Sequence, residues 1–300
     1  MKGRRLPWLL LGALFFHAQI VAAEVLILRA GDETVHHEAV TGLQSTLPDA
    51  LDVRVRPVAQ PRGDVESPTA VLAVGTHALQ AALQRYPDLP IFALLVPGQT
   101  IDALLGRAPH PDNDFGALYL DQPISRQARM ARALFPSLVR FGSIRSRSES
   151  PPPDNQRDEP DQTIELEYVA PQEPPLRAIT RLIPRVDAIL AVSDLRLYNA
   201  RTMHGILLAS YRANVPIIGY SRAMVRAGAL ASAWLSPRQH GAEAGRRIGP
   251  YLTGERTGWP GKSYSNQFRI AVNTRVARSL GLEPAVEVDG RVFHDGDAIR

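Results

Sequence analysis

The stretch MHGILLASYRANVPIIGYSRAMVRAGALASAWLSPRQHGAEAGRRIGPYL, residues 203–252, alternates helical and strand patterns and decides the fold. Residues 200–213 carry apolar side chains at helical spacing, and residues 215–220 form a short apolar run that predicts a buried strand. Helix, strand, loop and helix make half of a doubly wound α/β lobe. Because ligands bind beyond the carboxyl ends of strands in such sheets, Ser221 in the turn after this strand is a site candidate.

A further helix is predicted to begin at Ser236. The serine is a good N-cap, Pro237 is preorganised for the first helical position, and Gln239 completes a capping box. We expect this helix to pack closely on a sheet through a face of small and apolar residues: Gly241, Ala244, Gly245 and Ile248.

The opening stretch resembles the periplasmic solute-binding proteins of ABC transporters, in a family related to aromatic-amino-acid binders. In that family a strand of the type PVIGFS is followed by VRAGALA and by a TPEQ-G helix start, and here the chain reads PIIGYS, VRAGALA and SPRQHG. Three further segments match in family order: VLAVGTHAL (71–79), GALYLDQPISRQARMARALFP (116–136) and FRIAVNTRVARSLGL (268–282).

The resemblance implies an α/β protein of the type I periplasmic-binding fold. Two doubly wound parallel-sheet lobes would be joined by a multi-stranded hinge, with the ligand cleft between them. We expect residues 24–114 and 232–258 in lobe 1 and residues 115–231 and 259–300 in lobe 2, with the first crossing at 106–114.

One segment departs from the family pattern. Residues 145–162, RSRSESPPPDNQRDEPDQ, contain four prolines and no apolar residue, where family members usually place a helix. Three consecutive prolines cannot lie inside a helix. We therefore expect a solvated loop or a disordered segment here.

The N-terminus reads as a secretory signal over residues 1–23. A basic start containing Lys2, Arg4 and Arg5 precedes an apolar run, and small residues favour cleavage before Glu24, which predicts a periplasmic protein. An uncleaved membrane anchor is the alternative. Removal of the three basic residues would take the formal net charge from +4 to +1, which gives no argument for nucleic-acid binding. The absence of cysteine excludes disulfides and thiol catalysis.

Polar residues also follow three other predicted strands, where a sheet presents its carboxyl edge. These candidates are Thr76 after strand 70–74, Asp121 and Gln122 after strand 115–120, and Ser193 and Asp194 after strand 186–192. Helix-terminal amides beside Thr76 could hold a carboxylate or phosphate. By analogy with the family, Asp194 could accept an ammonium group and Ser193 could donate to a carboxylate. Simple helix capping stays open for Thr76, Asp121 and Asp194.

Two expectations concern side-chain direction. Tyr198 is predicted one turn into the helix after Asp194, where its ring is either a wall of the site or a packing residue. Helix 124–134 is expected to keep three arginines on its solvent side: Arg126, Arg129 and Arg132.

These features favour a binding protein over an enzyme. The chain has no G-x-S-x-G, H-E-x-x-H, P-loop or G-x-G-x-x-G motif, and adjacent His36 and His37 diverge by about 100° on a helix, so no catalytic or metal residue is predicted. The resemblance implies a monomer without a cofactor, which binds an amino acid-like molecule or another small carboxylate and docks on a membrane permease. A sensory or protein-interaction module on the same fold is the alternative.

Overall fold

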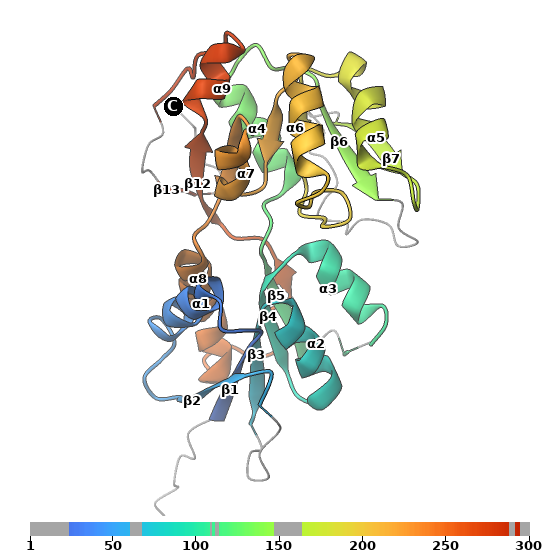
Figure 1. The fold of residues 1–300 in the computed structure, drawn as a ribbon. Coiled ribbons are helices and arrows are strands. Elements are labelled where there is room, and N and C mark those ends of the chain that lie inside the picture. The colour runs from blue at the N-terminus through green and yellow to red at the C-terminus, as the bar shows by residue number, and fades with distance from the viewer. Residues whose placement is uncertain are drawn as a thin grey trace, which may run out of the picture.

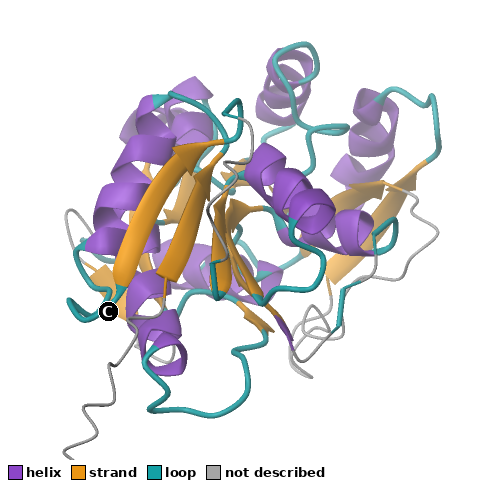
Figure 2. Ribbon diagram, turned by 90° about the horizontal axis from the view of Figure 1, so that it is seen from below, coloured by secondary structure: helices purple, strands orange, loops and turns teal. Residues whose placement is uncertain are grey.

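The computed structural model describes residues 24–60, 68–108, 110–111, 114–146, 164–287 and 292–294, which form two lobes stacked along one axis (Figure 1). Lobe 1 contains a sheet with the order β11-β5-β4-β3-β1-β2, and lobe 2 contains a sheet with the order β13-β12-β10-β9-β8-β6-β7. Helices flank the strands on both sides in the view from below (Figure 2). The predicted α/β class with two lobes is confirmed.

Within the described residues, lobe 1 is a fully parallel sheet with four helices. Its elements are β1 (Glu24–Arg29), α1 (Thr34–Gln44), β2 (Asp52–Pro57), β3 (Ala70–Val74), α2 (Thr76–Arg85), β4 (Ile91–Val96), α3 (Gly98–Leu105), β5 (Phe115–Tyr119), α8 (Pro237–Leu252) and β11 (Lys262–Ser263).

Lobe 2 has five parallel strands followed by an antiparallel pair at one edge. Its elements are α4 (Ile124–Leu134), β6 (Phe141–Ser146), β7 (Ile164–Val169), α5 (Pro175–Leu182), the 3-10 turn η3 (Ile183–Arg185), β8 (Ala188–Leu190), α6 (Met203–Arg212), β9 (Ile217–Gly219), α7 (Arg222–Ala227), β10 (Ala231–Trp234), β12 (Gln267–Val272), α9 (Thr274–Ser279) and β13 (Val292–His294).

The two lobes repeat one strand order. In lobe 1 the order β2-β1-β3-β4-β5 is the second, first, third, fourth and fifth strand of the lobe, and β7-β6-β8-β9-β10 gives the same sequence in lobe 2. This is a doubly wound order, in which the chain reverses direction across the sheet between the first and third strands. A crevice therefore opens at the carboxyl ends of β1 and β3 in lobe 1 and of β6 and β8 in lobe 2.

Alternation along the strands of lobe 1 separates two hydrophobic layers. Leu26 and Leu28 of β1 face a core completed by α2 and α3, whereas Val25 and Ile27 face a core completed by α1 and α8. Successive strand residues point to opposite faces, so a strand that is apolar throughout must be covered on both sides. The near-continuous apolar runs of β1, β3 and β4 require this sandwich.

Three expected lobe boundaries are corrected by the strand pairing. We expected residues 115–119 to open lobe 2, but β5 is hydrogen-bonded to β4 inside the sheet of lobe 1. Likewise β10 pairs with β9 and β12, which moves residues 232–234 into lobe 2, and β11 pairs with β5, which moves residues 262–263 into lobe 1. The apolar pattern of a segment predicts that it forms a strand, but it does not predict which other strand it pairs with.

The chain consequently crosses between lobes at residues 120–123, 235–236 and 264–266, which we call the hinge. Residues 106–114, expected as the first crossing, belong to the connection between α3 and β5. All three crossings run between the two lobes in the middle of the molecule (Figure 1). The multi-stranded connection between the two lobes agrees with the expectation.

The small-residue face of α8 packs mainly on a helix. An added Cβ would lie 1.9 Å from the Ala39 carbonyl oxygen at Gly241 and 2.2 Å from Thr46 Oγ1 at Gly245, and both contacts are with the segment of α1 and its end. Ala244 and Ile248 instead enter the core against the sheet. The prediction of sheet packing is therefore correct for the apolar pair and wrong for the two glycines.

Two predictions fall outside the described residues. The expected secretory signal at 1–23 lies there, as does most of the proline-rich segment, of which 147–163 is not described. Within the described ranges, no helix has the length and apolar character needed to cross a bilayer.

Candidate functional site

A pocket lies where the two lobes meet the hinge. Lobe 1 supplies Gln99 from the first turn of α3, and the remaining lining comes from the hinge and lobe 2: Asp121, Gln122, Ile124, Gln127, Arg145, Val192, Ser193 and Tyr264. The enclosed space is about 10 Å³, which is room for roughly one water molecule. A larger molecule would require the lobes or the lining side chains to move apart.

The lobe 2 side of this pocket is the crevice that the strand order creates. Arg145 is the penultimate residue of β6, and Ser193 follows β8, so both lie at the carboxyl ends of the two strands between which the order reverses. Ligands of doubly wound sheets bind at this position. The topology therefore places a cation and a hydroxyl where a ligand is expected.

Asp121 is held at the start of the first crossing by lobe 1. Its Oδ1 accepts a hydrogen bond from the Gly98 backbone N–H at 2.8 Å. Loss of solvent around the carboxyl raises its pKa above the ordinary aspartate value, although the Gly98 amide and the charge of Arg145 favour the ionised form. An incoming positive group would therefore be a favourable partner for this carboxylate.

Burial shifts the pKa of Arg145 in the opposite direction. Burial lowers the pKa of its guanidinium from the usual arginine value, and nearby Tyr198, Tyr264 and Asp121 oppose that change. An arginine remains protonated in proteins even after such a change. Asp121 and Arg145 thus present opposite charges to the same small space.

Two buried glutamines add neutral hydrogen-bonding groups. Gln122 accepts a hydrogen bond from Arg126 through Oε1, and its Nε2 has no hydrogen-bond partner among the described residues. The Oε1 of Gln127, on α4, also has none in that part of the chain. Buried amides of this kind normally have partners. Both side chains line the pocket, so a ligand could supply the missing hydrogen bonds.

The structure places three of the predicted site residues at this pocket: Asp121, Gln122 and Ser193. Asp194 is buried beside it, but its carboxylate accepts from Ser146 Oγ at 2.6 Å and from the Arg196 backbone N–H at 2.9 Å. Arg196 also forms an ion pair with it at 3.1 Å. The carboxylate of Asp194 is thus engaged within lobe 2.

Thr76, Tyr198 and Ser221 do not line the pocket. Thr76 begins α2, and Ser221 is the N-cap of α7, with its side chain accepting from the Met224 N–H. Tyr198 was expected inside a helix, but residues 195–202 form turns and α6 begins only at Met203. Ligand contacts by these residues remain predictions.

Tyr198 nonetheless has an unusual setting. Its side chain is buried, its hydroxyl has no hydrogen-bond partner in the described chain, and its ring meets that of Tyr220 edge-on at 6.3 Å. Burial raises the pKa of the phenol, so the hydroxyl remains a neutral donor. The ring is therefore a packing residue beside Tyr220 and is not part of the pocket lining.

Sequence reasoning missed four polar lining residues, Gln99, Gln127, Arg145 and Tyr264, and two apolar ones, Ile124 and Val192. Arg145 was assigned to the proline-rich loop, whereas β6 continues to Ser146. The rule that selected Asp121, a polar residue directly after a predicted strand, covers Arg145 as well, because Arg145 directly follows the predicted strand 138–144. Gln127 and Tyr264 carry no comparable local signal.

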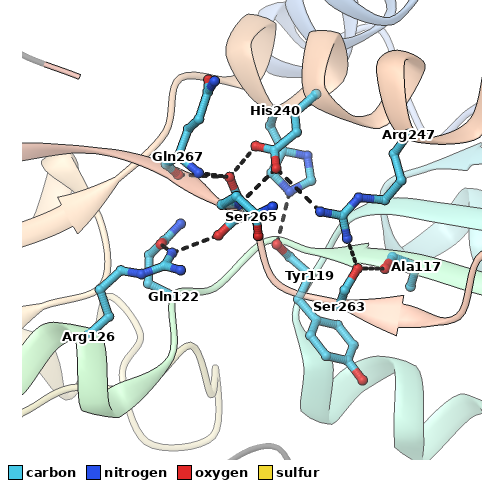
Figure 3. Close-up of polar contacts among 11 residues, drawn as sticks. Ala117, Tyr119, Gln122, Arg126, His240, Arg247, Ser263, Ser265 and Gln267 are labelled. Carbon is cyan, nitrogen blue, oxygen red and sulfur yellow. Dashed lines mark hydrogen bonds and ion pairs between the residues drawn. The ribbon is translucent and has the colours of Figure 1, made fainter. Parts of the chain in front are cut away.

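A polar cluster joins the hinge to both lobes (Figure 3). Arg126 was expected on the solvent side of α4, but it is buried and donates to the Ser265 carbonyl at 2.8 Å. From lobe 1, the carboxylate of Glu243 accepts from Ser265 Oγ and from the Asn266 N–H. The third crossing is therefore held from both sides by buried charged groups.

Known structures share this two-lobed architecture. A Streptococcus pneumoniae ABC domain in complex with L-Trp aligns with TM-score 0.55 and 19% identity over 87% of this chain and 95% of its own. This chain shares the fold of that protein. A conserved domain protein from Vibrio cholerae aligns with TM-score 0.56 and 17% identity over 88% and 96% of the two chains.

A ligand-free, open substrate-binding protein with adhesive properties from Clostridium difficile aligns with TM-score 0.62 and 16% identity over 89% of this chain and 98% of its own. No protein-family model matches the sequence, and the comparison with curated proteins finds no match. At these identities the similarity establishes the fold, and the resemblance to the solute-binding proteins is supported at that level.

Proposed function

We propose that this protein is the periplasmic solute-binding component of an ABC-type uptake system and that it binds a small carboxylate, such as an amino acid, between its lobes. The observation that carries the proposal is the pocket in which Asp121 and Arg145 face one space from the hinge and from lobe 2. Each lobe or crossing contributes polar groups, so a bound solute would connect all of them.

The two charges suggest how such a solute would be oriented. A guanidinium presents a planar set of donors that matches a carboxylate, and such charge-assisted hydrogen bonds are among the stronger ones. In our proposal Arg145 and Ser193 hold the carboxylate of the solute. Asp121 accepts from its amino group, and the free amide groups of Gln122 and Gln127 complete the contacts.

The narrow space requires a conformational change for entry. Hinge closure around a solute is a common behaviour of two-lobed binding proteins, and only a few residues need to change their backbone angles. The three crossings at 120–123, 235–236 and 264–266 are short enough to act in this way. Lobe separation would open the pocket, and a bound solute would favour the closed arrangement.

The neighbours with similar folds support the solute-binding reading. One of them is in complex with L-Trp, and another is described as a substrate-binding protein. Both share only the fold with this chain, so the choice of solute rests on the pocket. Membrane docking on a permease and a monomeric state are parts of the same proposal.

Thermal unfolding with a panel of amino acids, small carboxylates, sugars and nucleosides tests this function. A ligand that binds only the folded chain stabilises it by about 2.7 kcal/mol at a hundredfold excess over its dissociation constant. We expect a shift with carboxylate-bearing compounds. A shift restricted to sugars or nucleosides, or no shift with any class, would contradict the proposal.

A further inference from the structure

A second concave surface lies on α8, a helix that contributes no residue to the pocket in the cleft. Five residues of this helix line it at helical spacing: Glu243, Arg246, Arg247, Pro250 and Tyr251. The other walls come from the following turn, from β11, from the third crossing and from the start of β12: Arg256, Pro260, Gly261, Lys262, Ser263, Asn266 and Gln267. We call this surface the α8 groove.

The α8 groove has the size of a ligand site. Its volume is about 670 Å³, compared with about 10 Å³ for the pocket in the cleft. Sites for small molecules commonly occupy about 300–1,000 Å³. The groove is open to solvent along one side, so a ligand could enter it without any movement of the lobes.

The charges that line the groove are strongly unbalanced. Arg246, Arg247, Arg256 and Lys262 contribute four cations, and Glu243 is the one carboxylate among the lining residues. Glu243 is buried and is engaged with the hinge, because its oxygens accept from Ser265 Oγ and the Asn266 N–H. The solvent-facing part of the groove is therefore almost purely basic.

Two of these cations are not neutralised within the described part of the chain. Arg246 is exposed and has no ion pair there, and Arg256 lies over the ring of Tyr251 at 6.0 Å without a carboxylate partner. Lys262 is 3.3 Å from Asp102. The carboxylate of nearby Glu255 is turned towards Thr253, from which it accepts a hydrogen bond at 3.1 Å.

Arg247 is preorganised by the wall of the groove. It donates to Ser263 Oγ, as Figure 3 shows, and lies 3.6 Å from Glu243. An arginine held in this way loses less conformational freedom when it binds an anion. The groove thus combines one fixed guanidinium with two that are free to close on a ligand.

We propose that the α8 groove is a second binding site, specific for a small organic polyanion that carries two or more phosphate or carboxylate groups. Guanidinium groups pair with both kinds of oxyanion in the same two-point geometry. The basic charge on three separate elements suits a ligand with several anionic groups better than a single carboxylate. This site is independent of the solute in the cleft.

Calorimetric titration of the purified chain with inorganic pyrophosphate and, separately, with tricarballylate tests the proposal. The double variant Arg246→Gln/Arg256→Gln removes the two unneutralised cations. The control Arg212→Gln/Arg226→Gln removes the same charge from exposed positions of lobe 2. We expect binding of at least one anion, weakened by about tenfold or more in the groove variant and unchanged in the control.

The outcomes separate the two anion chemistries. Binding of pyrophosphate alone would assign a phosphorylated ligand, binding of tricarballylate alone would assign a polycarboxylate, and binding of both would assign recognition by charge. No binding of either anion at 10 mM, taken as about the weakest affinity of interest, would overturn the proposal. Equal weakening in the groove variant and the control would overturn it as well. A cleft variant such as Arg145→Gln should leave the pyrophosphate titration unchanged.

Discussion

Arg126 on α4 donates a hydrogen bond to the backbone carbonyl of Ser265 at 2.8 Å, which ties the first helix of lobe 2 to the third crossing of the hinge. The guanidinium also lies over the ring of Phe268, 5.1 Å from its centroid, at the start of β12. A residue on one lobe therefore fixes both the position of the crossing and the strand that it leads into.

Replacement of Arg126 by alanine should destabilise the chain by about 3 kcal/mol, because it leaves buried acceptors on Gln122 and Ser265 without a donor and opens a cavity. Urea denaturation measures the loss. The matched control Arg226→Ala, on an exposed position, should change stability by less than about 0.5 kcal/mol. Equal effects of the two variants would show that the hinge contact is unimportant.

The contact between α1 and α8 depends on glycine. In Gly241→Ala the added Cβ would lie 1.9 Å from the Ala39 carbonyl oxygen, far inside van der Waals contact. Alanine favours a helix over glycine by about 1 kcal/mol, but a clash with backbone should exceed this gain and destabilise the chain by about 3 kcal/mol.

The Gly261→Ala variant is the control for this change. Among the described residues, no atom lies within 4 Å of its added Cβ, and its backbone has no positive φ. Thermal or urea unfolding should therefore show a loss within about 0.5 kcal/mol. A stabilised Gly241→Ala variant would mean that the helices do not approach closely in solution.

His240 predicts a pH dependence of stability. It is buried on α8 and its Nε2–H donates to the Tyr119 carbonyl at 3.0 Å. Burial lowers the pKa of the imidazole below its ordinary value, and the bond to Tyr119 and the charge of Glu243 offset only part of this change. The unfolded chain consequently binds a proton more readily than the folded chain.

The contribution of neutral His240 to the free energy of unfolding should therefore be fully present above pH ~6.5. It should be lost as the pH falls towards the lowered pKa of the folded state. Urea denaturation between about pH 7.5 and pH 5, a range that includes the ordinary histidine pKa of about 6.5, would measure the decrease in the free energy of unfolding. The variant His240→Gln should be less stable at pH 7.5 but should lose less on acidification. The exposed control His204→Gln should retain the wild-type slope.

Structure that depends on neighbouring residues was predictable from the sequence, whereas pairing between distant segments was not. The capping box of Ser236 and Gln239 is present as predicted, since all its partners lie within four residues. The pairing of β5 was mispredicted, because its partner β4 lies beyond a helix and a connection and equally apolar strands occur in both lobes. Strand type is a property of the segment, whereas sheet membership is a property of the whole chain.

The site shows the same division. The expectation that polar residues after predicted strands lie at the carboxyl edge of the sheet correctly selected Asp121 and Ser193 as pocket residues. It could not foresee that Asp194, the next residue, would turn its carboxylate to Ser146 and Arg196. Arg126 was also misassigned, because an arginine within a polar helix face gives no indication that a carbonyl from a distant crossing will reach it.

The most direct test of the central claim is a paired titration of the solute found in the thermal panel and of its carboxamide analogue. Wild-type protein should bind the carboxylate about tenfold or more tightly than the amide, because Arg145 pairs with the charged form. In Arg145→Gln this preference should disappear, while Arg212→Gln should retain it. The same preference in Arg145→Gln as in the wild type would contradict the account, because the carboxylate would then be recognised elsewhere.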